Sequence, residues 1–422
     1  MSPEANNQGE GGAAGSRAGR EAWIAWEGSW GQLSPARVRA ARGLSLLATT
    51  RFRPALSLLR ECPPEELWSA PSTALRSWGL SPRSAEEFVV CRDRVSWGTT
   101  AEALRECGGR FVPVGSPEYP RELMHLTVPP AGLFVRAALA NWERLLGVPR
   151  VGVVGTRSVS VSGATTAGSF SAALAAAGIA VVSGLALGAD GAAHRGALEA
   201  GGLTVAVLGS GVDVASPGRH RPLYRDLCER GAALSEFPPG FKAARWTFPM
   251  RNRILAALSD AVVVIEAGSR SGALITAGEA ASLGRPVFAV PGPIGRDSHR
   301  GCNELLYAGA IPALDSQLLV QDFLYQTKNE RGNRRGDRER EEFDGRPTPE
   351  SCHSEGRRKA CDQTEHPHAR LLLEALGAGP LSLDQLAPVA GLSPREVSAA
   401  MAMLELDGLA ARAGPATYCL PA

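Results

Sequence analysis

Apolar positions change their spacing along this chain, and the change divides it into segments. From residue 21 to 95 apolar residues recur at helical spacing and are interrupted by prolines, which predicts a domain of four or five short helices. From residue 96 to 325 continuous apolar runs alternate with helix-length stretches. Runs that are apolar at every position are typical of parallel strands covered by helices on both faces. We therefore predict a Rossmann-like α/β domain over 96–325.

The apolar runs predict the strands of that domain. We expect five central strands at 150–155, 179–183, 203–208, 261–266 and 286–290, and two earlier ones at 110–114 and 132–136 that belong to the same domain. Helices between most of the strands indicate a doubly wound, mostly parallel sheet.

The helical segment contains one turn of interest, from Trp78 to Phe88. It resembles a helix-hairpin-helix (SAM-like) element, with Gly79 in the hairpin and Ser81 as the N-cap ahead of Pro82. Such hairpins can hold a DNA backbone, but a single copy is more typical of helix packing, which we favour.

The remaining segments differ in composition. Residues 1–20 are polar and glycine-rich and are predicted to be disordered, and residues 326–368 form a charged, flexible linker. Residues 369–422 predict a winged helix, with helices at 369–377, 383–390 and 393–407 and a hairpin at 409–420. Acidic side chains around Arg395 disfavour insertion of its third helix into DNA, so packing or protein contact is expected there.

Composition excludes several classes of protein. The net charge of +2 does not by itself indicate a nucleic-acid partner. The chain starts without a secretory signal and contains no apolar run long enough to span a membrane, so we expect a cytoplasmic protein. Cysteines and histidines between Cys352 and His368 fit no zinc spacing, and we expect no metal and no cofactor.

Glycine- and serine-rich turns follow the predicted strands, at Gly155, Gly184, Gly209 and Gly268. In open α/β sheets the carboxyl ends of the strands bind ligands, because glycines there let backbone N–H groups approach an anion. The stretch from Arg245 to Arg253 adds three arginines and two aromatic rings without a carboxylate. Phosphates and bases can both be held by such a surface.

Two carboxylates leave a catalytic alternative open. Asp190 and His194 lie at i and i+4, the spacing of an acid/base pair, although an N-cap role for Asp190 and a structural His194 are favoured. Glu266 ends a strand, where it could serve a hydrolase.

Several motifs together resemble the DprA (Smf) family of DNA-processing proteins: Val151-Gly-Val-Val-Gly-Thr-Arg157, Ser183-Gly-Leu-Ala-Leu-Gly-Ala-Asp-Gly-Ala-Ala-His194, Ala206-Val-Leu-Gly-Ser-Gly211, Ser235-Glu-Phe-Pro-Pro-Gly240 and Phe248-Pro-Met-Arg-Asn-Arg253. The resemblance implies a homodimer that binds single-stranded DNA on the Rossmann-like domain and loads RecA recombinase during natural transformation. It implies no catalytic site.

The resemblance also implies roles for individual residues. Gly155 and Arg157 would hold phosphate, the turn at 209–211 would line the groove, and Arg245 and Phe248 would grip backbone and base. Leu187 replaces an arginine that many members carry, which puts contacts from its loop in doubt. The full set of expected DNA-binding residues is Gly155, Thr156, Arg157, Ser183, Gly184, Gly209, Ser210, Gly211, Arg245, Phe248, Arg251, Arg253 and Ser271. Of these, Arg251 and Arg253 would divide their roles between DNA contact and support of the fold.

The rival from another class is a nucleotide phosphoribohydrolase of the same fold. Such enzymes carry a catalytic Glu in the loop that here follows Glu266, and no Glu occurs in this loop before Glu279. A second rival, an adaptor that acts only through the winged helix, is the least favoured.

Overall fold

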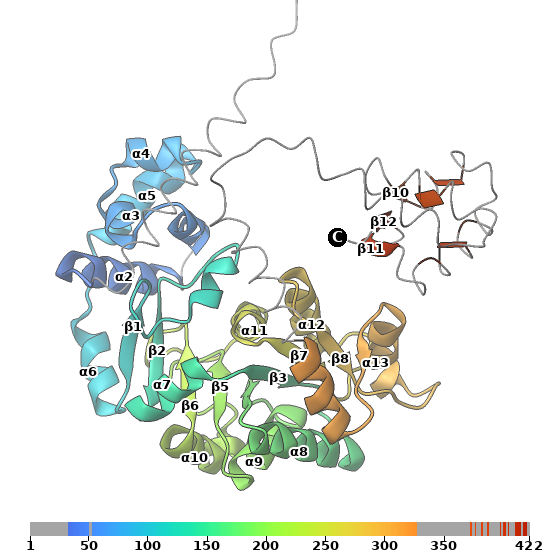
Figure 1. Cartoon of the computed structure of the whole chain (residues 1–422). Helices are drawn as coiled ribbons and strands as arrows, with labels where there is room; N and C mark the ends of the chain where they lie inside the picture. The colour runs from blue at the N-terminus through green and yellow to red at the C-terminus, as the bar shows by residue number, and fades with distance from the viewer. Residues whose placement is uncertain are drawn as a thin grey trace, which may run out of the picture. The chain divides into compact units, whose positions relative to one another are not determined.

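The computed structural model describes residues 33–49 and 53–326 (Figure 1). Within the carboxyl-terminal part it describes 372–373, 376, 381–382, 386–387, 397, 400–401, 404, 410–414 and 417–419. The chain divides into two compact units, Met1–Arg334 and Arg335–Ala422, and each is described by itself. The predicted disorder at 1–20, all but the first residue of the predicted linker at 326–368, and the cysteines and histidines of that linker lie outside the described residues.

The first unit begins with short helices around a small apolar core. Leu44, Leu56, Leu67, Leu75 and Phe88 are fully buried in this core, one from each successive element. These elements are α2 (Pro35–Leu47), the 3-10 helix η1 (Arg53–Arg60), α3 (Pro64–Ser69), α4 (Ser72–Ser77) and α5 (Pro82–Arg92), and α6 (Gly98–Glu106) follows. The prediction of four or five short helices is therefore confirmed.

The predicted hairpin has its expected local chemistry. The Ser81 hydroxyl accepts a hydrogen bond from the N–H of Ser84 at 3.1 Å, and Pro82 occupies the first position of α5. Gly79 has a φ of +98°, which only glycine adopts readily. Its neighbours Trp78 and Leu80 pack against the helical core.

A nine-stranded sheet within residues 110–312 forms the centre of the unit. Its order is β1-β2-β6-β5-β4-β3-β7-β8-β9, antiparallel at the β1–β2 and β2–β6 pairs and parallel elsewhere. The strands are β1 (Arg110–Pro113), β2 (Gly132–Ala137), β3 (Arg150–Val154), β4 (Ala180–Ser183), β5 (Thr204–Leu208), β6 (Ala232–Ser235), β7 (Ala261–Val264), β8 (Val287–Ala289) and β9 (Ile311–Pro312). This confirms the mostly parallel sheet and the place of β1 and β2 in it, whereas β6 and β9 were not predicted.

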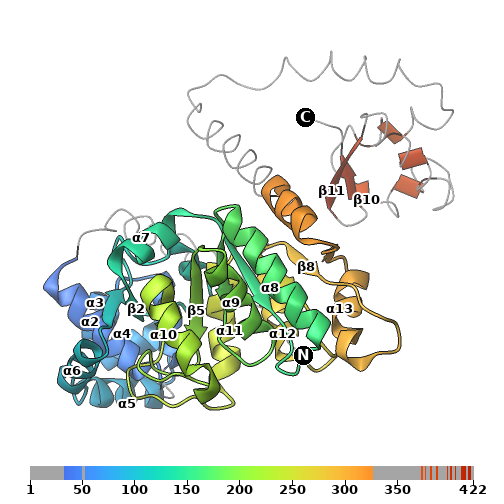
Figure 2. The same ribbon diagram turned by 90° about the horizontal axis from the view of Figure 1, so that it is seen from below.

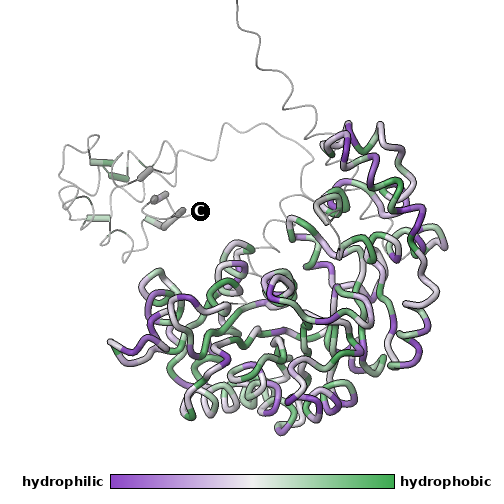
Figure 3. Tube along the Cα trace, turned by 180° about the vertical axis from the view of Figure 1, so that it is seen from behind, coloured by the Kyte–Doolittle hydropathy of each residue, from purple (hydrophilic) through white to green (hydrophobic). Residues whose placement is uncertain are grey.

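Helices cover both faces of the sheet (Figures 1 and 2). Val151 and Val153 of β3 pack in the core that includes α8 and α9, whereas Val154 packs in the core that includes α11 and α12. Figure 3 accordingly shows hydrophobic residues along the strands in the interior. The covering helices are α8 (Val161–Ala176), α9 (Ala189–Glu199) and α10 (Arg221–Arg230) on one face and α11 (Thr247–Leu258) and α12 (Gly272–Ser282) on the other, with α7 (Leu139–Gly147) and α13 (Asp297–Tyr307) toward the ends of the sheet.

The strand order reverses at β3. After β3 the chain builds β4, β5 and β6 on one side, and it then crosses back through α11 to place β7 on the other side. The loops that follow β3 and β7 therefore diverge and leave a crevice at the carboxyl ends of these strands.

In the second unit, three short strands form a sheet of order β10-β12-β11. The strands are β10 (Leu381–Ser382), β11 (Ala411–Gly414) and β12 (Thr417–Cys419), paired antiparallel. The β11–β12 pair confirms the hairpin predicted at 409–420. Leu372, Leu386 and Met401 are buried in a common core, while most of the three predicted helices lies outside the described residues.

Among the helices of the described residues, none has both the length and the hydropathy to cross a membrane.

Candidate nucleic-acid interface

The crevice between β3 and β7 holds a pocket of about 310 Å³. One backbone hydrogen bond and one close approach of the backbone bring the loops together around it. The N–H of Thr156 donates to the carbonyl of Glu266 at 2.7 Å, and a side chain at Gly155 would place its Cβ 2.6 Å from that of Ala189. Gly155 and Thr156 therefore set the wall of the pocket through their backbone.

Arg157 and Phe248 form the lip of this pocket. The Arg157 guanidinium carbon lies 4.4 Å from the centroid of the Phe248 ring, a cation–π contact. Arg157 is exposed after β3, and Phe248 is half-buried in the first turn of α11. The structure thus brings together two residues that are 91 positions apart in the sequence and were predicted to bind phosphate and base.

A second pocket, of about 180 Å³, lies on the other side of this pair and shares Arg157, Ala186 and Phe248 with the first. Gly184, Leu187 and Gly209 line it, as does the cis peptide Ser216–Pro217. A Cβ at Gly209 would lie 3.3 Å from the ring of Phe248, so glycine leaves this face of the ring accessible. We call the two pockets and their shared lip the groove.

Arg245 and Trp246 precede α11 and are exposed. The Trp246 ring packs edge-on against Phe237 and Phe241, with centroid separations of 5.9 and 5.8 Å, yet 47% of the residue remains accessible. No hydrogen bond or ion pair of Arg245 is found among the described residues. Trp246 was absent from the predicted site, although its place between Arg245 and Phe248 is a signal that the sequence carries.

The two remaining arginines of α11 have different surroundings. Arg253 donates from Nη2 to both carboxylate oxygens of Glu236 at 2.6 Å and from Nη1 to the carbonyl of Val128. Its role is therefore to hold the fold. Arg251 is 5% exposed, donates from Nη1 to the carbonyl of Val207 at 3.1 Å, and lines the first pocket. Burial lowers the pKa of Arg251, and the charge of Asp190 opposes that shift.

Several of the predicted site residues are used inside the protein. The buried Ser183 hydroxyl donates to the carbonyl of Val153 at 2.6 Å, and the Ser210 hydroxyl donates to that of Val214 at 3.0 Å. Gly211 is buried, and its N–H donates to the carbonyl of Phe241 at 2.9 Å. These three residues shape the loops and do not offer their polar groups to the groove.

Asp190 fixes the turn after β4. Its Oδ2 accepts from the N–H groups of Gly184 and Ala186 at 3.2 and 3.3 Å. The proposed N-cap role of Asp190 was wrong, because α9 begins after Gly188, whose φ of +81° gives the chain its entry into the helix. Burial raises the pKa of the Asp190 carboxyl, whereas Arg251 and the two N–H donors lower it.

Two histidines hold Leu185, the residue between those N–H groups. Leu185 has a φ of +56°, an uncommon value for a residue with a side chain. Its N–H donates to Nε2 of His194 at 3.3 Å, and its carbonyl accepts from Nδ1 of His220 at 3.0 Å. The turn at 184–186 is therefore bound by three side chains from outside it.

His194 is a structural residue, as the sequence favoured. Its Nδ1 donates to the Thr204 hydroxyl at 2.7 Å, and that hydroxyl donates to the carbonyl of Val181 at 2.9 Å. With Nε2 accepting from Leu185, the ring is neutral. Burial, His220 and the nearby arginines lower the pKa of His194 from 6.5 to about 3.

Glu266 is likewise engaged internally. Its buried carboxylate accepts from the N–H and the hydroxyl of Ser160, at 3.1 and 2.7 Å, at the start of α8. Ser271, at the far side of the first pocket, caps α12 by accepting from the N–H of Ala273 at 3.3 Å. The N-terminus of α12 therefore faces the pocket and favours an anion there.

Comparisons with known proteins agree with this architecture. Residues 110–324 match the family model of DNA recombination-mediator protein A, and residues 358–414 match that of the DprA winged helix domain. The chain is 34% identical to Protein Smf of Synechocystis sp. over 82% of this chain and 89% of the relative. It is 37% identical to a putative DNA processing protein DprA of Mycobacterium tuberculosis, over 73% of this chain and 76% of the relative. A solved structure of DNA processing protein A from Streptococcus pneumoniae matches with a TM-score of 0.55 and 28% identity, over 71% of this chain and 96% of that one.

Proposed function

Because the chain belongs to the DprA (Smf) family of DNA-processing proteins, we propose that it binds single-stranded DNA in the groove and loads RecA recombinase onto the bound strand during DNA uptake. The observation that carries the DNA-binding part is the stacked pair of Arg157 and Phe248 at the switch point of the sheet. A single nucleotide can therefore contact both the Arg157 cation and the aromatic face of Phe248.

The groove offers the two kinds of contact that a single strand requires. Arg157 and Arg245 supply positive charge for successive phosphates, and the rings of Phe248 and Trp246 supply faces on which unpaired bases stack. Stacking contributes about 1–3 kcal/mol per base and is tolerant of sequence. A duplex keeps its bases stacked inside, so single strands bind more tightly than duplexes and with little sequence preference.

In this function the protein binds DNA and does not catalyse a reaction on it. A hydrolase of this fold would need a free carboxylate beside the pocket, whereas Glu266 is bonded to Ser160 and Asp190 is bonded to the turn after β4. Release of free base from a nucleoside monophosphate by the pure protein, lost in Glu266→Gln, would contradict this assignment.

The partners follow from family membership. We include RecA recombinase, a second copy of the chain in a homodimer, and a cytoplasmic location in the proposal, because these belong to the function that the family resemblance implies. Stimulation of RecA filament formation on protein-coated strands tests the loading step directly.

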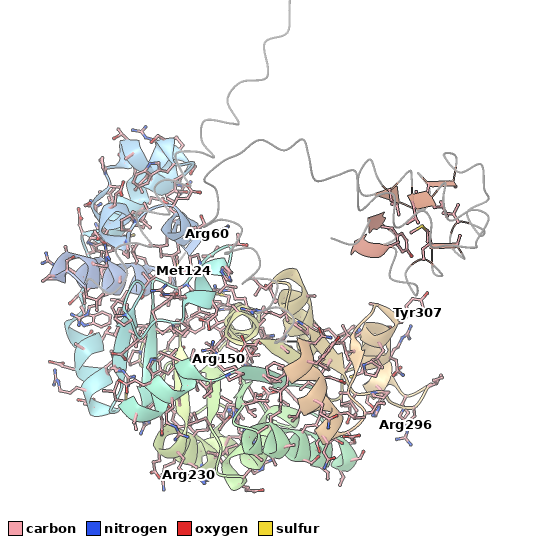
Figure 4. The ribbon with its side chains drawn as sticks, viewed as in Figure 1. Arg60, Met124, Arg150, Arg230, Arg296 and Tyr307 are labelled. Carbon is pink, nitrogen blue, oxygen red and sulfur yellow. The ribbon has the colours of Figure 1, made fainter. Side chains whose placement is uncertain are left out.

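Binding of a labelled oligothymidylate across a salt series tests the groove. Loss of one phosphate contact with a single strand lowers the slope of log K against log salt by about 0.7, and we expect this for Arg157→Ala and for Arg245→Ala. Arg230→Ala is the matched control, since Arg230 is an exposed arginine on α10 that lies at the edge of the molecule, outside both pockets (Figure 4). If both groove variants bind with the wild-type slope, the strand binds elsewhere.

A further inference from the structure

The first pocket of the groove has a floor of buried side chains. Leu255, Ala273 and Thr276 lie there with exposures of 1%, 6% and 2%. The openings of the pocket lie on the other side: Arg157 and Gly272 are exposed, and Gly155, Thr156, Ala186, Phe248 and Ser271 are half-buried. At about 310 Å³ the pocket is at the lower end of the range of roughly 300–1,000 Å³ for small-molecule sites. Because its floor is closed, a group that enters from the open side ends there.

Arg251 lines this pocket and keeps one buried donor without a hydrogen-bond partner among the described residues. Its Nη1 donates to Val207, and its Nε is buried and makes no hydrogen bond among the described residues. Only 5% of the Arg251 surface is exposed. A buried charged donor without a partner is costly, so a site of this kind calls for an acceptor.

Asp190 does not fill that need. No ion pair joins it to Arg251 within 4 Å in the described part of the chain, and its Oδ2 already accepts from Gly184 and Ala186. It is also the only carboxylate among the residues that line the pocket. Two guanidinium groups, Arg157 and Arg251, therefore face one carboxylate that is bound elsewhere.

The start of α12 adds to the positive potential. Gly272, Ala273 and Thr276 of its first turns line the pocket, and Asn252 holds the helix start by donating to the carbonyl of Gly272 at 3.2 Å. An eleven-residue helix directs a partial positive charge of roughly half a unit at its N-terminus. The helix and Arg251 thus act on the same small volume.

We propose that this pocket binds a phosphate monoester, either the terminal phosphate of a DNA strand or that of a free nucleotide. A monoester carries a charge of about −1.5 to −2 at neutral pH and has three acceptor oxygens, which suits two guanidinium groups and a helix start. A phosphodiester within a strand has two substituents, and both would have to leave through the same lip. The inference rests on the proposed function, since the lip of the pocket is the DNA groove.

Oligothymidylates of equal length with hydroxyl ends, a 5′-phosphate or a 3′-phosphate test the proposal, with thymidine 5′-monophosphate and inorganic phosphate as competitors. We expect a terminal phosphate to raise the affinity of the strand about tenfold, as a charge-assisted hydrogen bond does. Arg251→Gln should abolish this ratio. Competition by the free nucleotide without any gain from a terminal phosphate would identify free nucleotides as the ligand.

A second variant avoids the buried arginine. A Cβ at Gly272 would meet nothing within 4 Å, so Gly272→Glu fits the fold and places a negative charge at the pocket. It should also abolish the ratio. Gly278→Glu is the matched control, because Gly278 lies in the same helix with equally open space but does not line the pocket.

The outcomes separate the two proposals. Tight binding of the hydroxyl-ended strand that weakens in Arg157→Ala supports the DNA groove whatever the pocket does. The monoester site is refuted if, in addition, a terminal phosphate does not raise the affinity of the strand and neither thymidine 5′-monophosphate nor inorganic phosphate competes with it. The proposal for the DNA groove is unaffected by that result. A gain that persists in both Arg251→Gln and Gly272→Glu also refutes the pocket as its origin. If no strand binds at all, the proposed function itself fails.

Discussion

Acid should destabilise the first unit through His194. The folded protein keeps this ring neutral, because Nε2 accepts from Leu185 and burial lowers its pKa to about 3. In the unfolded chain the ring has an ordinary pKa near 6.5 and takes up a proton as the pH falls. The unfolded state then binds more protons than the folded state, so stability is full above pH 6.5 and is lost as the pH falls toward 3.

The size of this effect follows from the two pKa values of 6.5 and about 3. Between pH 7 and pH 5 the proton bound by the unfolded chain removes about 2 kcal/mol, and below that the loss approaches about 1.4 kcal/mol per pH unit. Asp190 has the opposite sign, since burial raises its pKa and penalises its charged form, so the protein's total slope is not that of His194 alone.

A variant isolates the contribution of the ring. His194→Gln keeps an acceptor for the N–H of Leu185 but has no proton to gain, so the variant is less stable at pH 7 and lacks the loss of stability that His194 causes as the pH falls. Urea unfolding followed by tryptophan fluorescence at several pH values measures both proteins. The expected result is a gap between wild type and variant that narrows by about 2 kcal/mol from pH 7 to pH 5. A gap that stays constant would refute the assignment of a neutral buried ring.

Two further substitutions test the packing beneath the groove. Gly184→Ala places a Cβ 1.3 Å from Nη1 of Arg251, so it should lower the melting temperature, whereas Gly147→Ala, with open space around its Cβ, should not; equal melting temperatures would contradict this packing. Arg253→Ala removes the cation that pairs with the buried carboxylate of Glu236 and should cost about 3–5 kcal/mol in urea unfolding. Arg245 is exposed, so Arg245→Ala should leave the free energy of unfolding unchanged. A larger loss of stability in Arg245→Ala than in Arg253→Ala would show that Arg245 supports the fold and Arg253 does not.

The sequence predicted the parts of the fold that depend on long apolar runs. Strands such as β7 are continuous runs of valine, buried on both faces, and were found. The strand β6 has four residues, Ala232–Ser235, with a single large apolar side chain, and β9 has two residues, so neither has a pattern that stands out from a loop. Their place in the sheet depends on neighbours that are far away in sequence.

The site was predicted at the level of loops more than of side chains. Glycines after strands predicted the edge of the sheet at which the structure has the two pockets, because a turn's composition is local. Whether the Ser183 hydroxyl faces the groove or the carbonyl of Val153 depends on how β4 lies against β3, which the sequence does not specify. Arg251 and Arg253 are the same residue type two positions apart on α11, so they point to different sides, and only the partners Val207 and Glu236 distinguish them.

In the turn at 184–186, the path of the backbone does not depend on the side chain at position 187, which follows the turn. Its backbone is held by Asp190, His194 and His220, which lie outside the turn, so position 187 carries no part of that task. Leu187, the next residue after the turn, borders the second pocket. A substitution at position 187 can therefore change the chemistry of the second pocket, while the loop that presents the side chain keeps its shape.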